Sequence, residues 1–143
     1  MRALLDVNVL IALLDASHVH HARATDWLSR HVGQGWASCP ITQNGCVRIM
    51  SQPSYPNALP TAEVAQRLSE AAADRSHEFW PDAVNLLEPG RFDWLRLLGP
   101  RQIADAYLLA LAVENGGRFV SLDQRVALDA VPGAQKRHCV VLV

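Results

Sequence analysis

The sequence predicts an α/β fold with three layers, α/β/α, in which a central, mainly parallel sheet lies between helices. The prediction rests on two observations: short apolar runs alternate along the chain with longer segments of helical periodicity, and Gly, Pro or Asn residues separate them. Strands that alternate with helices are joined by crossovers, which make the strands parallel and place helices on both faces of the sheet. At 143 residues the chain has the length of one domain, and we expect residues 1–143 to form it.

The composition is that of a globular protein with no broad electrostatic surface. Half of the residues are hydrophobic, 19% are charged and the net charge is −1. This charge argues against wide electrostatic binding of duplex nucleic acid but permits a small basic patch. Three cysteines without metal-type spacing (Cys39, Cys46 and Cys139) favour a reduced, cytoplasmic compartment. No apolar stretch has the length of a membrane span.

The amino-terminal third begins with an apolar strand over residues 2–5 and a helix over about 8–15. A second helix, with Trp27 on its apolar side, continues to about Val32. Three histidines lie within His18–His21, a density that invites a metal-site interpretation. No cysteine or carboxylate pair accompanies them, so we favour a solvated loop.

The middle of the chain contains the second strand, over 36–39, which Pro40 ends. Thr42 is a good N-cap for a helix that continues to about Met50. Three prolines within residues 53–60 predict a loop, after which Thr61 caps another amphipathic helix.

The last part of the chain begins with a short strand over 78–80. Aromatic and leucine residues within 82–99 predict only a small amphipathic turn or helix. The strongest helix of the sequence covers Arg101–Glu114 and ends at an Asn-Gly-Gly stop. Apolar runs at 119–122 and 139–143 predict the last two strands.

Three aspartates are expected to meet at one edge of this sheet. Asp6 and Asp123 each follow a strand, and Asp105 lies near the start of a helix that returns to the same edge. Taken alone, Asp6 is as well explained by capping the helix that follows it. Three adjacent carboxylates repel one another unless a cation lies among them, and a cation with oxygen ligands, Mg²⁺ or Mn²⁺, fits this set. Asn8 could add an amide oxygen or orient a ligand.

Other chemistries that use an aspartate after the first strand do not fit. Phosphatases of the haloacid dehalogenase type need a second Asp two positions later, where this chain has Asn8, and a downstream Lys. Response-regulator receivers need a Lys on a late strand, and Lys136, the only lysine, precedes the last one. No phosphate-binding glycine loop or Gly-x-Ser-x-Gly motif is present. Metal-assisted phosphodiester hydrolysis remains.

At these residues the chain resembles the PIN-domain ribonucleases, specifically the VapC toxins of bacterial toxin–antitoxin pairs. The matching segments extend through most of the chain, and they are Leu4–Leu10, Thr42–Arg48, Asp105–Ala110 and Val120–Asp123.

The resemblance implies a PIN-like fold and Mg²⁺-dependent endonucleolytic cleavage of RNA, often of a tRNA or rRNA stem-loop. It also implies a homodimer and a small cognate antitoxin that inserts a segment into the active-site groove. In this comparison Asp6, Asp105 and Asp123 match the acidic metal-binding positions. For a dimer, Leu13, Leu14 and Trp27 could supply the contact, or they could fill the core of the monomer.

Two further positions follow from the resemblance. Many relatives carry Glu where this chain has Gln43, so the charge of the site is reduced if Gln43 lies beside the aspartates. Arg48 matches a recurrent Arg, which either contacts RNA phosphate or forms a salt bridge on the helix surface. The change at Gln43 leaves open a catalytically weak module that binds RNA or protein. A flap or DNA nuclease is disfavoured because the chain lacks a basic arch.

Overall fold

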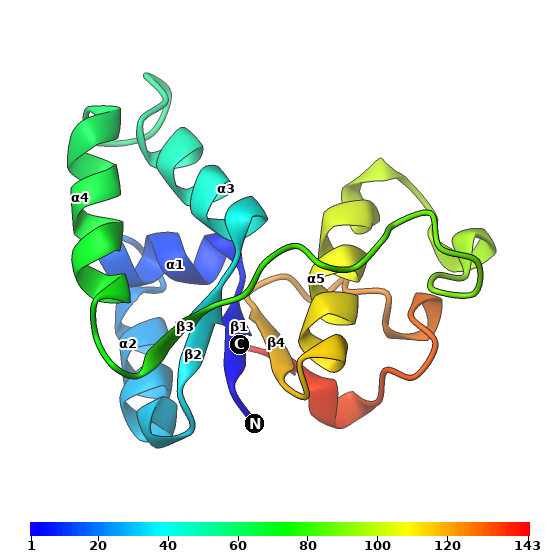
Figure 1. Ribbon diagram of the computed structural model, residues 1–143. Helices are drawn as coiled ribbons and strands as arrows, with labels where there is room; N and C mark the ends of the chain where they lie inside the picture. Colours follow the sequence, from blue (N-terminus) through cyan, green and yellow to red (C-terminus); the bar gives the residue numbers. More distant parts are fainter.

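Five short strands form one sheet in which every neighbouring pair is parallel (Figure 1). The coordinates are a computed structural model that describes all 143 residues. The strands are β1 (Ala3–Leu5), β2 (Trp36–Ser38), β3 (His77–Phe79), β4 (Arg118–Ser121) and β5 (Cys139–Val141). The prediction of a mainly parallel sheet is confirmed, and the sheet is in fact wholly parallel. The predicted strands at 36–39, 78–80, 119–122 and 139–143 are displaced or shortened by one or two residues.

The strand order β3-β2-β1-β4-β5 places β1 at the centre of the sheet. The chain adds β2 and β3 on one side of β1 and later returns to add β4 and β5 on the other side. The direction of winding therefore reverses between β1 and β4, where Leu5 pairs with Val120. In open α/β sheets, ligands bind in the crevice outside the carboxyl ends of the strands at such a reversal. Asp6 and Asp123 follow these two strands.

Helices cover both faces of the sheet, which confirms the three-layer prediction (Figure 1). Four helices lie on one face and one on the other: α1 (Val7–Leu14), α2 (His21–His31), α3 (Pro40–Met50) and α4 (Thr61–Ala72), and opposite them α5 (Ile103–Glu114). The alternation of side chains along β1 separates two buried cores. Ala3 and Leu5 join the core under α1–α4, whereas Leu4 joins the core under α5.

Helix α3 begins two residues before the predicted N-cap, Thr42. Cys39 is the N-cap, and Pro40 occupies the first helical position, where the missing N–H costs nothing. The hydroxyl of Thr42 accepts a 3.0 Å hydrogen bond from the backbone N–H of Cys39, so Thr42 works from the third position of the helix. As a result Gln43 is the fourth residue of α3 instead of the first.

Helix α5, in contrast, starts later than the sequence indicated. Pro100–Gln102 form a 3-10 turn, and the α-helix begins at Ile103, so Asp105 lies in its first turn. Between β3 and Pro100 the only regular element is another 3-10 turn, Trp94–Arg96. Leu95 and Leu98, placed on an amphipathic turn by their spacing, are 92% and 86% exposed.

Of the residues considered for a dimer contact, Trp27 belongs fully to the monomer core and Leu13 and Leu14 belong to it in part. Trp27 is buried, and Leu13 and Leu14 pack against the same core on the α1–α4 face. No helix is both long and apolar enough to cross a membrane.

Candidate active site

Two hydrogen bonds hold the side chain of Asp6 at the carboxyl end of β1. Its Oδ1 accepts a 2.7 Å hydrogen bond from the backbone N–H of Val7, so Asp6 caps α1. Its Oδ2 accepts a 2.6 Å hydrogen bond from the hydroxyl of Ser121 on β4. Burial raises the pKa of Asp6 and outweighs these two donors, which lower it. The capping interpretation and the site interpretation are therefore compatible.

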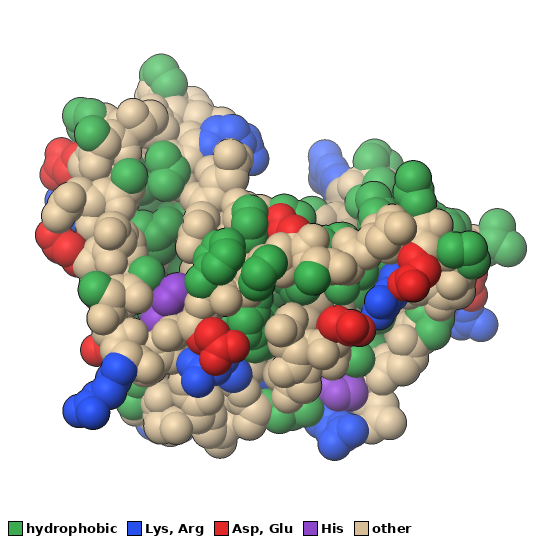
Figure 2. Space-filling model, viewed as in Figure 1, with side chains coloured by type: hydrophobic (Ala, Val, Ile, Leu, Met, Phe, Trp, Pro, Cys, Tyr) green, Lys and Arg blue, Asp and Glu red, His purple; other side chains and the backbone are tan.

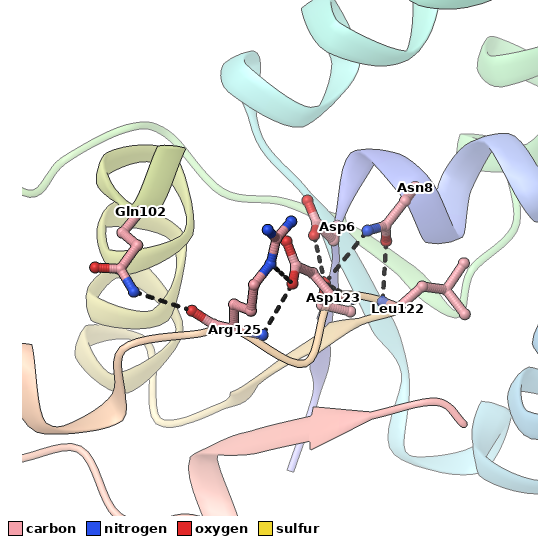
Figure 3. A network of polar contacts seen from close by, with 7 residues as sticks. Asp6, Asn8, Gln102, Leu122, Asp123 and Arg125 are labelled. Carbon is pink, nitrogen blue, oxygen red and sulfur yellow. Dashed lines mark hydrogen bonds and ion pairs between the residues drawn. The ribbon is translucent and has the colours of Figure 1, made fainter. Parts of the chain in front are cut away.

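Ser121 ties the ends of β1 and β4 together and was missed from the sequence. Besides its bond to Asp6, its hydroxyl accepts from the backbone N–H of Asp123 at 2.9 Å and from Nδ2 of Asn8 at 3.4 Å. Oδ1 of Asn8 accepts from the backbone N–H of Leu122 at 3.1 Å (Figure 3). The sequence signal was a single serine inside an otherwise apolar run, Phe119–Leu122, and the structure buries it fully.

Asp123 lies on the turn after β4 and is held by Arg125. Its Oδ1 accepts from the backbone N–H of Arg125 at 2.8 Å and from Nε of the same residue at 3.2 Å (Figure 3). These donors, the backbone N–H above all, hold the pKa of Asp123 below its usual range. Asp123 is therefore an ionised carboxylate at neutral pH.

Asp105 reaches the same place from the first turn of α5. Burial raises the pKa of Asp105 to about 7, and the negative charges of Asp6 and Asp123 add to this effect. Burial is the larger cause, and the repulsion by Asp6 and Asp123 comes second.

One cavity contains all three carboxylates. Its volume is about 430 Å³, and its lining includes Asp6, Asp105 and Asp123 together with Asn8, His18 and Arg101. A second cavity of about 290 Å³ adjoins it, sharing Arg101 and the last two aspartates and adding Arg125. The two linings therefore combine carboxylates with the cationic side chains of Arg101 and Arg125, a surface suited to a phosphate group beside a cation.

Gln43 does not lie beside the aspartates, contrary to its assignment as a neighbour of the metal ligands. Its Nε2 donates a 3.0 Å hydrogen bond to the hydroxyl of Ser38, which is 2.7 Å from Nε2 of His77. The early start of α3 turns Gln43 toward β2 and β3. On the same helix, Asn44 and Arg48 line the groove that faces α5.

Arg48 is exposed and belongs to none of the ion pairs of the structure, so the salt-bridge alternative is not supported. It lines two grooves that both lie on α3, outside the carboxylate cavity.

Within the histidine-rich segment His18–His21, no three side chains are grouped as metal ligands would be. His20 precedes α2, and the ring of His21 is hydrogen-bonded to the carbonyl of Ala12 at 2.8 Å. His18, however, lines the carboxylate cavity, which the sequence did not indicate. Its Nδ1 accepts from the backbone N–H of His20 at 3.0 Å, so the neutral ring carries its proton on Nε2.

The donor set fits a divalent cation with oxygen ligands. All three acidic groups offer carboxylate oxygens, and the charges of Asp6 and Asp123 add to burial in raising the pKa of Asp105. No three His, Cys, Asp or Glu side chains are close enough to form a ready-made metal centre. Such an arrangement suits a divalent cation that is bound through one or two carboxylates together with a further oxygen ligand.

The chain is similar to known proteins over most of its length. The PIN domain family matches residues 3–133. Ribonuclease VapC44 of Mycobacterium tuberculosis is 54% identical over 142 residues, which cover 99% of this chain and all of the relative. Ribonuclease VapC39 of the same species is 42% identical over 134 residues, covering 93% of this chain and 96% of the relative.

Among solved structures, the fold is similar to that of the Mycobacterium tuberculosis toxin VapC20, described as cleaving the sarcin–ricin loop. The TM-score is 0.62, with 12% identity, and the match covers 93% of this chain and 98% of that one. At this identity the likeness concerns the fold alone. The family match and the full-length relatives together show that the chain belongs to the PIN-domain family, among the VapC ribonucleases.

Proposed function

We propose that this protein is a Mg²⁺-dependent endoribonuclease that acts as the toxin of a toxin–antitoxin pair. The observation that carries the proposal is the convergence of Asp6, Asp105 and Asp123, from three separate elements, on one cavity at the reversal of the sheet. The relatives named ribonuclease VapC support RNA as the substrate. The target class is a structured RNA such as a tRNA or rRNA. The protein acts in the cytoplasm, and its partner is a cognate antitoxin.

The cavity of the three aspartates would hold the cation, Mg²⁺ or alternatively Mn²⁺, through one or two of their carboxylates together with substrate phosphate. When bound, the cation supplies charge stabilisation at the scissile phosphate and activates water. Ser121 and Asn8 keep Asp6 and Asp123 in place by joining α1 to the end of β4.

The cationic side chains around the cavity hold the RNA backbone. Arg101 lines both cavities that contain Asp105 and Asp123, so it is placed to bind a phosphate adjacent to the cleaved one. His18 can donate from Nε2 to a phosphate oxygen, since its Nδ1 is already an acceptor. Arg48 provides a further cation along α3.

The alternative of a catalytically weak binding module rested on Gln43 within the acidic site. Gln43 is instead bonded to Ser38, so its lack of charge does not weaken the carboxylate set. Self-association remains part of the proposal, through a surface other than the buried Trp27.

The test is cleavage of total cellular RNA by the purified chain. We expect cleavage with Mg²⁺, loss of cleavage with a chelator, and recovery when Mg²⁺ or Mn²⁺ is returned. Cleavage that survives chelation would contradict the metal-dependent mechanism.

A further inference from the structure

A second groove, between α3 and α5, continues from the carboxylate cavity. Its volume is about 450 Å³, and its lining includes Asn44 and Arg48 of α3, Asp82, and Ala104 of α5. Val7 lines both this groove and the carboxylate cavity. Because Val7 follows Asp6 and Ala104 precedes Asp105, a nucleotide joined to the cleaved phosphate would lie in this groove.

Figure 2 shows the hollow between the lobe of α3 and α4 and the lobe of α5, with Lys or Arg side chains on both rims and an acidic group at its floor. Gly45 keeps this side of α3 close to α1, because a Cβ there would lie 2.7 Å from Cγ2 of Val7. The groove is therefore shaped by packed helices.

Asp82 is the unexplained group of this groove. Its Oδ1 is buried and accepts no hydrogen bond. The neighbouring backbone is fixed, since the side chain of Trp80 is buried and its backbone N–H donates to the carbonyl of Ser38 at 2.9 Å. Buried carboxylate oxygens without a donor destabilise a protein, so an unpaired one beside an active site calls for a ligand that donates hydrogen bonds.

We propose that this groove binds a guanine base of the RNA, next to the cleaved phosphate, through Asp82. The inference rests on the proposed ribonuclease function. A carboxylate offers two acceptors side by side, and guanine alone among the four bases presents two adjacent donors, N1–H and N2–H, on its Watson–Crick edge. The carboxylate torsion of Asp is broad, so a small rotation brings both oxygens of Asp82 to the groove.

The other residues of the groove complete the match. The carboxamide of Asn44 can donate to O6 of guanine, the acceptor that adjoins N1–H. Arg48, which has no acidic partner, lies on the same face of α3 and neutralises a backbone phosphate. Cytosine and uracil place an acceptor, O2, where guanine has N2–H, and a carboxylate repels it. Adenine has a C–H group there and an acceptor, N1, where guanine has N1–H, so it offers the carboxylate neither donor.

The first test is cleavage of an unstructured RNA pool of random sequence, with the cut ends sequenced. We expect guanine to be enriched about tenfold at one nucleotide beside the cut for the wild type, and the enrichment to disappear in Asp82→Asn. Asp26→Asn, which changes an exposed carboxylate on α2, is the matched control and keeps the preference. A guanine preference that persists in Asp82→Asn, or no preference beside the cut in the wild type, would overturn the proposal.

The second test does not need cleavage, so its failure is distinguishable from failure of the ribonuclease proposal. Binding of short fluorescent RNAs is measured in chelator, with guanine replaced by inosine or by 7-deazaguanine. Inosine lacks the N2 amino group and should bind several-fold more weakly, whereas 7-deazaguanine keeps the Watson–Crick edge and should bind like guanine. If the inosine RNA bound like guanine and the 7-deazaguanine RNA bound more weakly, the assignment of Asp82 would be rejected.

Thermal melting separates a role in binding from a role in the fold. The carboxylate of Asp82 lies near the start of α3, so it could serve only the stability of that helix. In that case Asp82→Asn would melt at a lower temperature and leave base preference unchanged, and this result would also refute the guanine site.

Discussion

The hydroxyl of Ser121 donates a 2.6 Å hydrogen bond to Oδ2 of Asp6, joining residues that are 115 positions apart in the chain. Through this bond the end of β4 is held against the end of β1, and the backbone N–H of Asp123 is bonded to the same oxygen of Ser121. One buried hydroxyl therefore sets the separation of two of the three proposed cation ligands.

Replacing this hydroxyl should weaken both fold and catalysis. In Ser121→Ala the buried Oδ2 of Asp6 and the N–H of Asp123 lose their partner, so we expect about 1–3 kcal/mol lower stability. Cleavage should fall about tenfold, as is typical when a group that orients a metal ligand is removed. Chemical denaturation and an RNA cleavage assay measure the two effects. Ser29→Ala, which removes an exposed hydroxyl bonded to the carbonyl of Asp26, is the control and should change neither.

The raised pKa of Asp105 predicts a pH dependence of stability without metal. The folded state keeps the proton up to about pH 7, whereas the unfolded chain releases it near its ordinary value of 3.8. The folded state therefore binds more protons in this window, and the free energy of unfolding falls as pH rises from about 4 to 7. Because Asp105 is partly exposed, we expect a decrease on the order of 1–2 kcal/mol.

Asp105→Asn isolates this contribution. Melting of both proteins in chelator at several pH values should give a difference that grows in favour of the variant between pH 4 and 7. If the melting temperatures of the two proteins changed in parallel over this pH range, the surroundings of Asp105 would not disfavour its ionised form.

Gln43→Glu should leave cation binding unchanged, because Gln43 is bonded to Ser38 and lies outside the cavity of the aspartates. The new carboxylate would instead favour the protonated form of the nearby His77, whose pKa is lowered by burial. Calorimetric titration with Mn²⁺ should give affinities within about twofold of each other, and NMR titration should show the pKa of His77 rising. Distinctly tighter Mn²⁺ binding by the variant would place residue 43 at the metal site.

Self-association should be visible by sedimentation at micromolar concentration, as a species of about twice the 15.7 kDa mass of the chain. Trp27 is buried in the monomer, so Trp27→Ala should lower the melting temperature through loss of core packing. A single 15.7 kDa species throughout the concentration series would refute dimerisation.

The parts of this structure that topology dictates were predictable from sequence. Alternating apolar runs and helices gave the parallel, three-layer arrangement, and the sheet edge then brought Asp6, Asp105 and Asp123 together. What could not be predicted depended on side-chain direction and on local ends of helices. A start two residues earlier, at Pro40, turns Gln43 away from the site and Asn44 toward the groove.

Contacts between residues distant in sequence were also beyond prediction. Ser121 looked like one polar residue in an apolar strand, although its hydroxyl connects Asp6, Asn8 and Asp123. Asp82 lies in an irregular segment without periodicity, so nothing in the sequence placed it opposite α3.

The most direct test of the account is RNA cleavage by Asp105→Asn compared with Asp26→Asn, with folding of both verified by melting. Asp105 lines the carboxylate cavity, whereas Asp26 is an exposed residue of α2 paired with Arg30. We predict that Asp105→Asn is folded and cleaves RNA slower than wild type by a factor on the order of 100 or more in saturating Mg²⁺. Asp26→Asn should cleave at the wild-type rate. A folded Asp105→Asn that cleaves as fast as the wild type would contradict the assignment of the three aspartates as the catalytic centre.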